Sequence, residues 1–243
     1  TEWLSQDEIP RLTKGELTLK LEEKWAKKID TKYSVFVNSG SSSILLTLAA
    51  MLHLDKVSKK PLKNKKIIVP ALSWATDVSS PMLLGYETIM FGFASFFSMY
   101  FGHHLSTIEG GFINTNDEDF YHLLLMMRSH GWDRDLPTWK QIQLREQHNC
   151  TDFDSLYNFY VPGMNLRSTD LQAFIGLRAI DKLDDYSSKR RDNFKYYMNN
   201  LKNNHLHLEE KTNDYVSSFA IPIVHPMRND IIRDLIDNDI EVR

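Results

Sequence analysis

The chain has 243 residues, a formal net charge of −3 and 42% hydrophobic residues. This length supports one large domain or two smaller ones with a sizeable core. The near balance of charge, without a long Lys/Arg run, argues against nucleic acid or an anionic membrane as a partner. The single cysteine, Cys150, cannot form an internal disulfide or build a zinc or iron–sulfur site alone, which makes a reducing cytoplasm the expected location.

Helical and strand patterns alternate along the chain. Thr169 and Gln172 have the spacing of a capping box that opens a helical region to about Leu201, and Asn116 is expected to cap the helix before it. The alternation predicts an α/β fold with a mainly parallel sheet. In chain order, we expect a helix over 18–28, a strand over 33–37, a helix over 44–54, a strand over 67–69, a helix over 76–84, a strand near 112–113, a helix ending near 128, a strand over 217–224, a helix over 230–236 and a strand start at 240–242.

The first motif is Asn38-Ser39-Gly40-Ser41-Ser42, between the strand over 33–37 and the next helix. A Gly turn and hydroxyls at a helix start form a ready anion site, because the backbone N–H groups there are unpaired and the helix dipole is positive. Taken alone, the same residues also fit a simple helix cap without a ligand.

Three further motifs follow. Trp74, in the segment Pro70-Ala71-Leu72-Ser73-Trp74-Ala75-Thr76, follows the strand over 67–69 by a few residues, near a strand end where α/β proteins bind ligands, although it also fits an ordinary core position. Residues 98–111 read Ser-Met-Tyr-Phe-Gly-His-His-Leu-Ser-Thr-Ile-Glu-Gly-Gly, and the His103 imidazole can move protons near neutral pH. Residues 162–173 read Pro-Gly-Met-Asn-Leu-Arg-Ser-Thr-Asp-Leu-Gln-Ala.

Together the four motifs resemble the DegT/DnrJ/EryC1/StrS sugar aminotransferase family of pyridoxal-phosphate enzymes, over roughly residues 33–177. In that family, residues 98–111 correspond to Ser-Phe-x-x-x-Lys-x-x-x-x-Gly-Glu-Gly-Gly, and the Lys forms the Schiff base to the cofactor. Counting back from Glu109, the Lys position is His103 here, which is similar to the nucleotide-sugar 3-dehydratase branch. Imidazole cannot form a stable imine with an aldehyde. The family's Gly before Glu-Gly-Gly is Ile108 in this chain.

The resemblance implies a role for each matching residue. Gly40, Ser41, Ser42 and Ser98 would bind the cofactor phosphate, Trp74 would stack on the pyridine ring, and His103 would be catalytic. Asn165 would reach the phosphate in the neighbouring subunit, which implies a homodimer with shared active sites. Arg128 and His130 also fit the family, although a helix C-terminus explains them adequately.

The resemblance also implies a cofactor and a reaction. The cofactor would be pyridoxal 5′-phosphate or pyridoxamine 5′-phosphate, and the substrate a nucleotide-linked 4-keto-6-deoxy sugar that undergoes C3 dehydration, with glutamate as the amino donor. Cell-surface polysaccharide is the family's usual destination. Three alternatives stay open: a sugar aminotransferase, which needs a Lys that no position between Lys66 and Lys140 provides; an iron–sulfur-dependent 3-dehydratase, which needs more cysteines; and an inactive sugar-binding paralogue.

The implied architecture is the type I aminotransferase fold, a three-layer αβα domain with a smaller C-terminal α+β domain. We expect the large cofactor-binding domain over residues 1–180 and a truncated smaller domain over 181–243. Near residues 87–92, several β-α units of the family are absent, and one of them normally carries the Asp that pairs with the pyridine nitrogen. A missing internal segment at this place is therefore expected.

Overall fold

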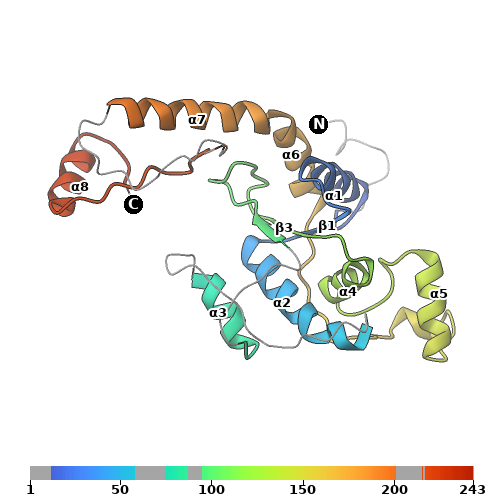
Figure 1. Ribbon diagram of the computed structural model, residues 1–243. Coiled ribbons are helices and arrows are strands. Elements are labelled where there is room, and N and C mark those ends of the chain that lie inside the picture. The colour runs from blue at the N-terminus through green and yellow to red at the C-terminus, as the bar shows by residue number, and fades with distance from the viewer. Residues whose placement is uncertain (1–11, 58–74, 87–94, 201–214, 216, 243) are drawn as a thin grey trace. The chain divides into compact units, whose positions relative to one another are not determined.

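The computed structural model describes residues 12–57, 75–86, 95–200, 215 and 217–242 (Figure 1). It divides into two compact units, Thr1–Asp181 and Lys182–Arg243. The strand expected over 67–69 and the expected missing segment near 87–92 both lie outside the described residues.

Three strands form the described sheet of the first unit: β1 (Tyr33–Val37), β2 (Ser95–Ser98) and β3 (Gly111–Thr115). Their order is β1-β3-β2, and β3 is antiparallel to both neighbours. β1 and β2 therefore run in the same direction. The expectation of a mainly parallel sheet is met only in this shared direction, because β3 returns beside β2 as the second strand of a hairpin, whose base is closed by the Met99 N–H donating to the Gly110 carbonyl.

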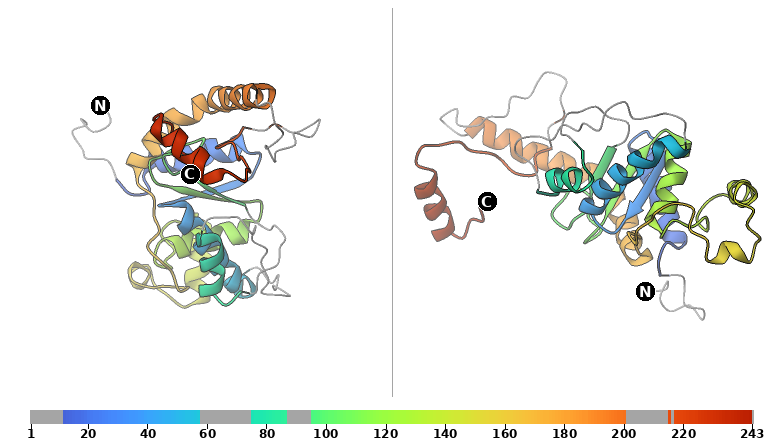
Figure 2. Two further views of the ribbon diagram at one scale, coloured as in Figure 1. Left: turned by 90° about the vertical axis from the view of Figure 1, so that its left-hand side faces the viewer. Right: turned by 90° about the horizontal axis from the view of Figure 1, so that it is seen from below.

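Helices cover both faces of this sheet, as the expected three-layer arrangement requires (Figures 1 and 2). On one face α1 (Glu16–Lys28) packs its Trp25 ring onto Phe112, with the ring centroids 5.3 Å apart. On the other face lie α2 (Gly40–Val57) and α4 (Glu118–Arg128). Alternate residues of a strand point to opposite faces, so the buried Val35, Val37 and Ile113 join the core under α2 and α4.

The remaining helices in the described part of this unit are α3 (Ala75–Leu83), α5 (Thr138–Gln147) and α6 (Asp170–Ala179), with a short 3₁₀ turn at Asp154–Leu156. A second 3₁₀ turn, Ile180–Lys182, spans the boundary between the two units. The capping box of Thr169 and Gln172 is confirmed at the start of α6. The expected cap at Asn116 is wrong. Asp117 caps α4 and accepts from the Phe120 N–H, because the Asn116 side chain accepts from the Lys32 N–H instead, at 2.9 Å.

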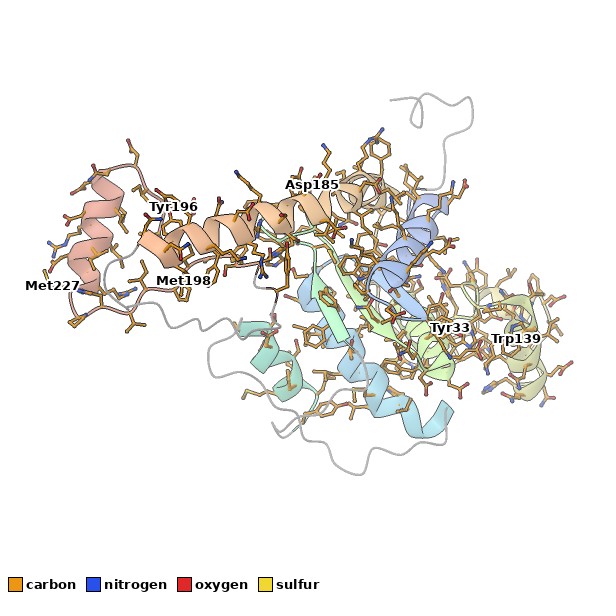
Figure 3. The ribbon with its side chains drawn as sticks, turned by 45° about the horizontal axis from the view of Figure 1, so that its top comes forward. Tyr33, Trp139, Asp185, Tyr196, Met198 and Met227 are labelled. Carbon is orange, nitrogen blue, oxygen red and sulfur yellow. The ribbon has the colours of Figure 1, made fainter. Side chains whose placement is uncertain are left out.

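The second unit contains α7 (Leu183–Asn200), along which Figure 3 labels Asp185, Tyr196 and Met198, and α8 (Arg228–Asp237). The strands expected over 217–224 and at 240–242 are wrong: the described part of those segments holds one bridge residue, Ile223, and no strand. An alternating apolar pattern makes a strand only where a neighbouring strand pairs with it. Among the described helices of both units, none is long and apolar enough to cross a membrane.

A buried cluster of charges joins α1 to α4 and β1. The Arg128 side chain is fully buried, and its Nη1 donates to Glu22 Oε1 at 2.7 Å and to the Phe36 carbonyl at 2.8 Å. Lys14 and Asp135 form a second buried pair, 2.8 Å apart. Arg128 therefore ties the end of α4 to β1, one residue before the strand ends, rather than serving only as a helix C-terminal cation.

Two pKa shifts follow from this cluster. Burial, assisted by repulsion from Arg128, lowers the pKa of Lys14 to about 8 against the opposing pull of Asp135. Burial raises the pKa of Asp135, but attraction and a hydrogen bond from Lys14, with Arg128 and Ser129, more than offset this, and the net shift is downward.

Candidate active site

The segments that carry the described candidate site residues meet at the end of the sheet where β1 and β2 finish. Val37, the last residue of β1, lies opposite Gly111, the first residue of β3, and Gly111 lies opposite Ser98, the last residue of β2. The segments that follow β1 and β2 therefore leave the sheet at the same edge. In open α/β sheets this carboxyl edge is where ligands bind.

The start of α2 offers hydrogen-bond donors at this edge. Ser39 caps the helix, since its Oγ accepts from the Ser42 N–H at 3.0 Å and its carbonyl accepts from the Ser43 N–H at 3.1 Å. The N–H groups of Gly40 and Ser41 have no such acceptor among the described residues, and the first turn contains no acidic side chain. An anion is thus the ligand that this helix end favours.

Gly40 and Ser98 lie in close contact. A Cβ placed on Gly40 would come within 2.5 Å of the Ser98 Cβ and 2.6 Å of its Oγ. Gly111 makes a similar approach from β3, where a Cβ would lie 2.4 Å from the Ser39 carbonyl oxygen. The two glycines let the strand ends and the helix start meet, which places the Ser98 hydroxyl beside the first turn of α2.

The start of α3 also lies beside the start of α2. The Ser41 hydroxyl lies 3.1 Å from the Thr76 hydroxyl, in the first turn of α3. Sequence reasoning did not identify Thr76 as a site residue. The sequence feature that could have identified Thr76 is its hydroxyl at the start of a helix that follows a predicted strand.

His103 lies in the loop of residues 99–110, between β2 and β3. Backbone hydrogen bonds close the base of this loop, with the Met99 N–H donating to the Gly110 carbonyl at 2.8 Å and the Thr107 N–H donating to the Met99 carbonyl at 2.9 Å. The His103 N–H donates to the Tyr100 carbonyl at 3.0 Å, and the two rings meet edge to face with centroids 6.0 Å apart. His103 is half-buried, so its imidazole is accessible from solvent.

Ile108 in this loop has a left-handed backbone, with φ of 71°. A β-branched residue is a genuine outlier in that region, which glycine occupies readily. The family's Gly at this position therefore has a backbone reason, and this chain keeps the turn despite Ile108. The Ile108 side chain is 59% exposed.

Asn165 lies on the other side of β1 from β3. The adjacent Leu166 carbonyl accepts from the Asn38 N–H at 3.1 Å, and Arg167 forms a bridge with Val37. The Asn165 side chain is exposed and accepts from Arg167 Nε at 3.1 Å. The structure thus brings Gly40, Ser41, Ser42 and Ser98 together, with His103 in the loop that follows and Asn165 beside the end of β1. Trp74 lies outside the described residues.

These residues fit a phosphate-bearing cofactor. Two N–H groups at a helix start, the hydroxyls of Ser41, Ser42 and Ser98, and the absence of acid in the first turn of α2 form a donor-rich, uncharged cradle. A phosphate monoester needs such donors.

The comparison with a family model decides the family. The DegT/DnrJ/EryC1/StrS aminotransferase family model matches residues 8–93 and 90–243. The chain belongs to this family. The resemblance that the motifs indicated is confirmed over nearly the whole chain, and the two matched pieces meet at residues 90–93.

Named relatives and solved structures narrow the comparison. The chain is 27% identical over 299 residues to GDP-4-keto-6-deoxy-D-mannose 3-dehydratase of Escherichia coli O55:H7, with 93% of this chain and 76% of that protein covered. The protein of the same name from Yersinia pseudotuberculosis is 27% identical over 252 residues, with 74% and 63% covered, so the chain spans less than two thirds of that relative. A structure of the E. coli dehydratase with bound hydrated PLP matches with a TM-score of 0.78 and 26% identity, covering 96% of this chain and 78% of that one. The aminotransferase fold is thereby confirmed.

Proposed function

We propose that this protein removes the C3 hydroxyl of a nucleotide-linked 4-keto-6-deoxy sugar, with pyridoxal or pyridoxamine phosphate bound without a covalent Lys anchor. The observation that carries the proposal is His103, which occupies the Lys position of the family in a loop that starts at the phosphate site. Similarity to two relatives that are named GDP-4-keto-6-deoxy-D-mannose 3-dehydratase supports the proposal. Structures related to this chain contain hydrated PLP, a PLP–glutamate adduct and GDP-perosamine, which supports the cofactor, glutamate and a GDP-linked sugar.

Each candidate site residue has a part in the proposed reaction. The N–H groups of Gly40 and Ser41 and the hydroxyls of Ser41, Ser42 and Ser98 would hold the phosphate, and Trp74 would supply the aromatic ring for stacking on the pyridine. The chemistry that such a cofactor supplies is an amine that condenses with a ketone and a ring that withdraws electrons. The His103 imidazole would act as the general base and then the general acid, taking up a proton beside the cofactor amine and giving a proton to the departing C3 hydroxyl. Since His103 forms no stable bond to the cofactor aldehyde, its nitrogen stays available for both transfers.

Mass spectrometry of the sugar product tests the proposal. Purified protein is incubated with pyridoxamine phosphate, glutamate and a GDP- or CDP-linked 4-keto-6-deoxy sugar. Loss of the C3 oxygen is the expected result. Net amination would identify an aminotransferase instead, and no turnover with either sugar would indicate a binding paralogue. Turnover that depends on an added reductase would indicate an iron–sulfur-dependent enzyme.

We further propose a homodimer in which Asn165 of one subunit completes the phosphate site of the other. The exposure of Asn165 on a segment anchored to β1 supports this role. A mixture of His103→Asn and Asn165→Ala variants tests it after subunit exchange. If sites are shared, each mixed dimer has one intact site, and about a quarter of wild-type activity returns. If each site lies within one subunit, both variants stay inactive after mixing.

We also propose that the family's acidic partner of the pyridine nitrogen belongs to a segment missing near residues 87–92. Three observations support this. The family match divides at residues 90–93, the alignment to the E. coli relative is longer than this chain, and β2 has a partner on one side only among the described strands, with Phe96 and Phe97 exposed. Mass spectrometry of the protein from its native cells tests the proposal: the 243 residues account for 28.4 kDa, and peptides that add several kDa between residues 86 and 95 are expected, whereas a continuous peptide across residues 87–92 would contradict the proposal.

The single cysteine supports a cytoplasmic location for this reaction. The relative named lipopolysaccharide biosynthesis protein RfbH of Salmonella typhimurium, 28% identical over 142 residues, supports a role in making cell-surface sugars.

A further inference from the structure

We infer that Thr76 is a positioning residue of the phosphate site, which holds the Ser41 hydroxyl and aligns it toward the phosphate. The inference rests on the proposed cofactor and gives a role to a residue to which the family resemblance assigned none. Its starting observation is the 3.1 Å contact between the two hydroxyl oxygens, which joins the first turns of α2 and α3.

The contact is fixed by the packing of α3 on α2. After α3 ends, the Tyr86 ring packs against Ile44 and Leu48 of α2, and the Tyr86 hydroxyl donates to the Leu48 carbonyl at 2.7 Å. Tyr86 is buried, with 7% of its surface exposed. The relative position of the two helices is therefore set by side chains away from the phosphate site, and the Thr76 hydroxyl is delivered to Ser41 in a defined place.

The pair of hydroxyls can point its protons in either direction. Each hydroxyl can donate one hydrogen bond and accept two, and its proton rotates to suit the surroundings. Without an anion, Ser41 can donate to Thr76. With a phosphate beside the start of α2, Thr76 donates to Ser41 and Ser41 donates to the phosphate. A chain of two hydrogen bonds with the same direction strengthens the terminal one.

Thr76 acts through its hydroxyl and not through the charge of its helix end. Asp77, the next residue, lies in the first turn of α3 and offsets the positive end of that helix dipole. The first turn of α2, by contrast, has no acidic side chain. A phosphate is thus attracted to α2, and α3 contributes the hydroxyl that orients Ser41.

A double-mutant cycle tests the inference through cofactor binding. The affinity for pyridoxamine phosphate is measured by fluorescence titration of wild type, Thr76→Val, Ser41→Ala and the double variant. Thr76→Val keeps the shape of the side chain and removes the hydroxyl. We expect it to weaken binding about fivefold in wild type and less than about twofold when Ser41 is already Ala.

Two comparisons separate positioning from a general structural effect. Thr76→Ser keeps the hydroxyl and is expected to bind like wild type. Pyridoxamine, which lacks the phosphate, is expected to bind Thr76→Val and wild type equally. An equal loss in both Ser41 backgrounds, an equal loss for pyridoxamine, or unchanged binding by Thr76→Val would each overturn the inference.

The outcomes also distinguish the inference from the proposed function. If wild type does not bind pyridoxamine phosphate, both are overturned. If binding shows the expected coupling but the sugar keeps its C3 oxygen, the proposed reaction fails and the role of Thr76 stands.

Discussion

The side chain of Ser98 fills the space that a side chain at Gly40 would need. Residue 40 starts α2 and residue 98 ends β2, so the contact joins two elements at the phosphate site. It makes glycine a requirement of packing at residue 40, in addition to any need for backbone N–H groups.

Gly40→Ala is therefore expected to destabilise the protein, although Ala usually stabilises a helix relative to Gly. A new Cβ 2.5 Å from the Ser98 Cβ forces β2 or α2 to move, and such overpacking costs about 1–3 kcal/mol. Urea unfolding measures the loss, and pyridoxamine phosphate titration is expected to show weaker binding. Gly40→Ala with Ser98→Gly removes the two nearest clashing atoms and should recover stability. No recovery in the double variant would argue against this contact.

His103→Lys is expected to attach the cofactor covalently and to suppress C3 dehydration. A Lys amine forms an imine with the cofactor aldehyde, whereas imidazole does not, and the proton transfer assigned to His103 is lost with it. Borohydride reduction followed by mass spectrometry of the protein should show a stable adduct in the variant and none in wild type. His103→Asn controls for loss of the imidazole alone. Unchanged 3-deoxygenation by His103→Lys would contradict the catalytic role.

Ile108→Gly is expected to stabilise the protein by about 1 kcal/mol, because the left-handed backbone at φ of 71° strains a β-branched residue but not glycine. The exposed Ile108 side chain contributes little packing that could offset the gain. Urea unfolding is the measurement, and Ile108→Ala is the control, since it removes the branched side chain but keeps a Cβ. A gain for Ala as large as for Gly would show that removal of the exposed branched side chain, and not relief of a Cβ in the left-handed backbone, raises the stability.

Arg128→Met is expected to destabilise the protein by about 3–5 kcal/mol, because it leaves the buried Glu22 carboxylate without its cation. Adding Glu22→Gln removes the unpaired charge and keeps an acceptor for the Phe36 N–H, so part of the loss should return. Wild type, the single variant and the double variant are compared by urea unfolding. Equal instability of the single and double variants would show that the charge of Glu22 is not the cause.

The contribution of Lys14 to the free energy of unfolding is expected to increase between pH 8 and pH 10.5. Its pKa is about 8 in the folded protein and 10.5 ordinarily, so the unfolded chain binds more protons in this window and stability increases with pH there. The difference in unfolding free energy between wild type and Lys14→Met isolates this component, which should grow by about 1–3 kcal/mol. A flat difference from pH 8 to pH 10.5 would contradict the lowered pKa.

Local patterns predicted much of the fold. The helices that became α1, α2, α3 and α4 were expected from their apolar spacing and end residues, and the capping box at Thr169 and Gln172 was found from two side chains alone. Asn116 and Asp117 are both good caps by type. Only the sheet, which uses Asn116 for the Lys32 N–H, decides between them.

Long-range contacts could not be predicted in this way. The order β1-β3-β2, the contact of Gly40 with Ser98 and the pairing of Ser41 with Thr76 join residues far apart in the chain. Arg128 had a sufficient local explanation as a helix-end cation, and its partner Glu22 lies 106 positions earlier. The strand predicted at 217–224 is reduced to the single bridge residue Ile223 in the described part of that segment, and its own sequence does not specify how far such pairing extends.

The loop between β2 and β3 carries residue 103, the position at which a dehydratase and an aminotransferase of the family differ. Its base is closed by main-chain hydrogen bonds between Met99, Thr107 and Gly110, which do not depend on the identity of residue 103. A different loop tip can therefore be grafted between the same two strands without a new sheet. An aminotransferase and a dehydratase can thus be alternative inserts on one scaffold, and the exchange of loops 99–110 between family members is a practical route to new deoxysugar catalysts.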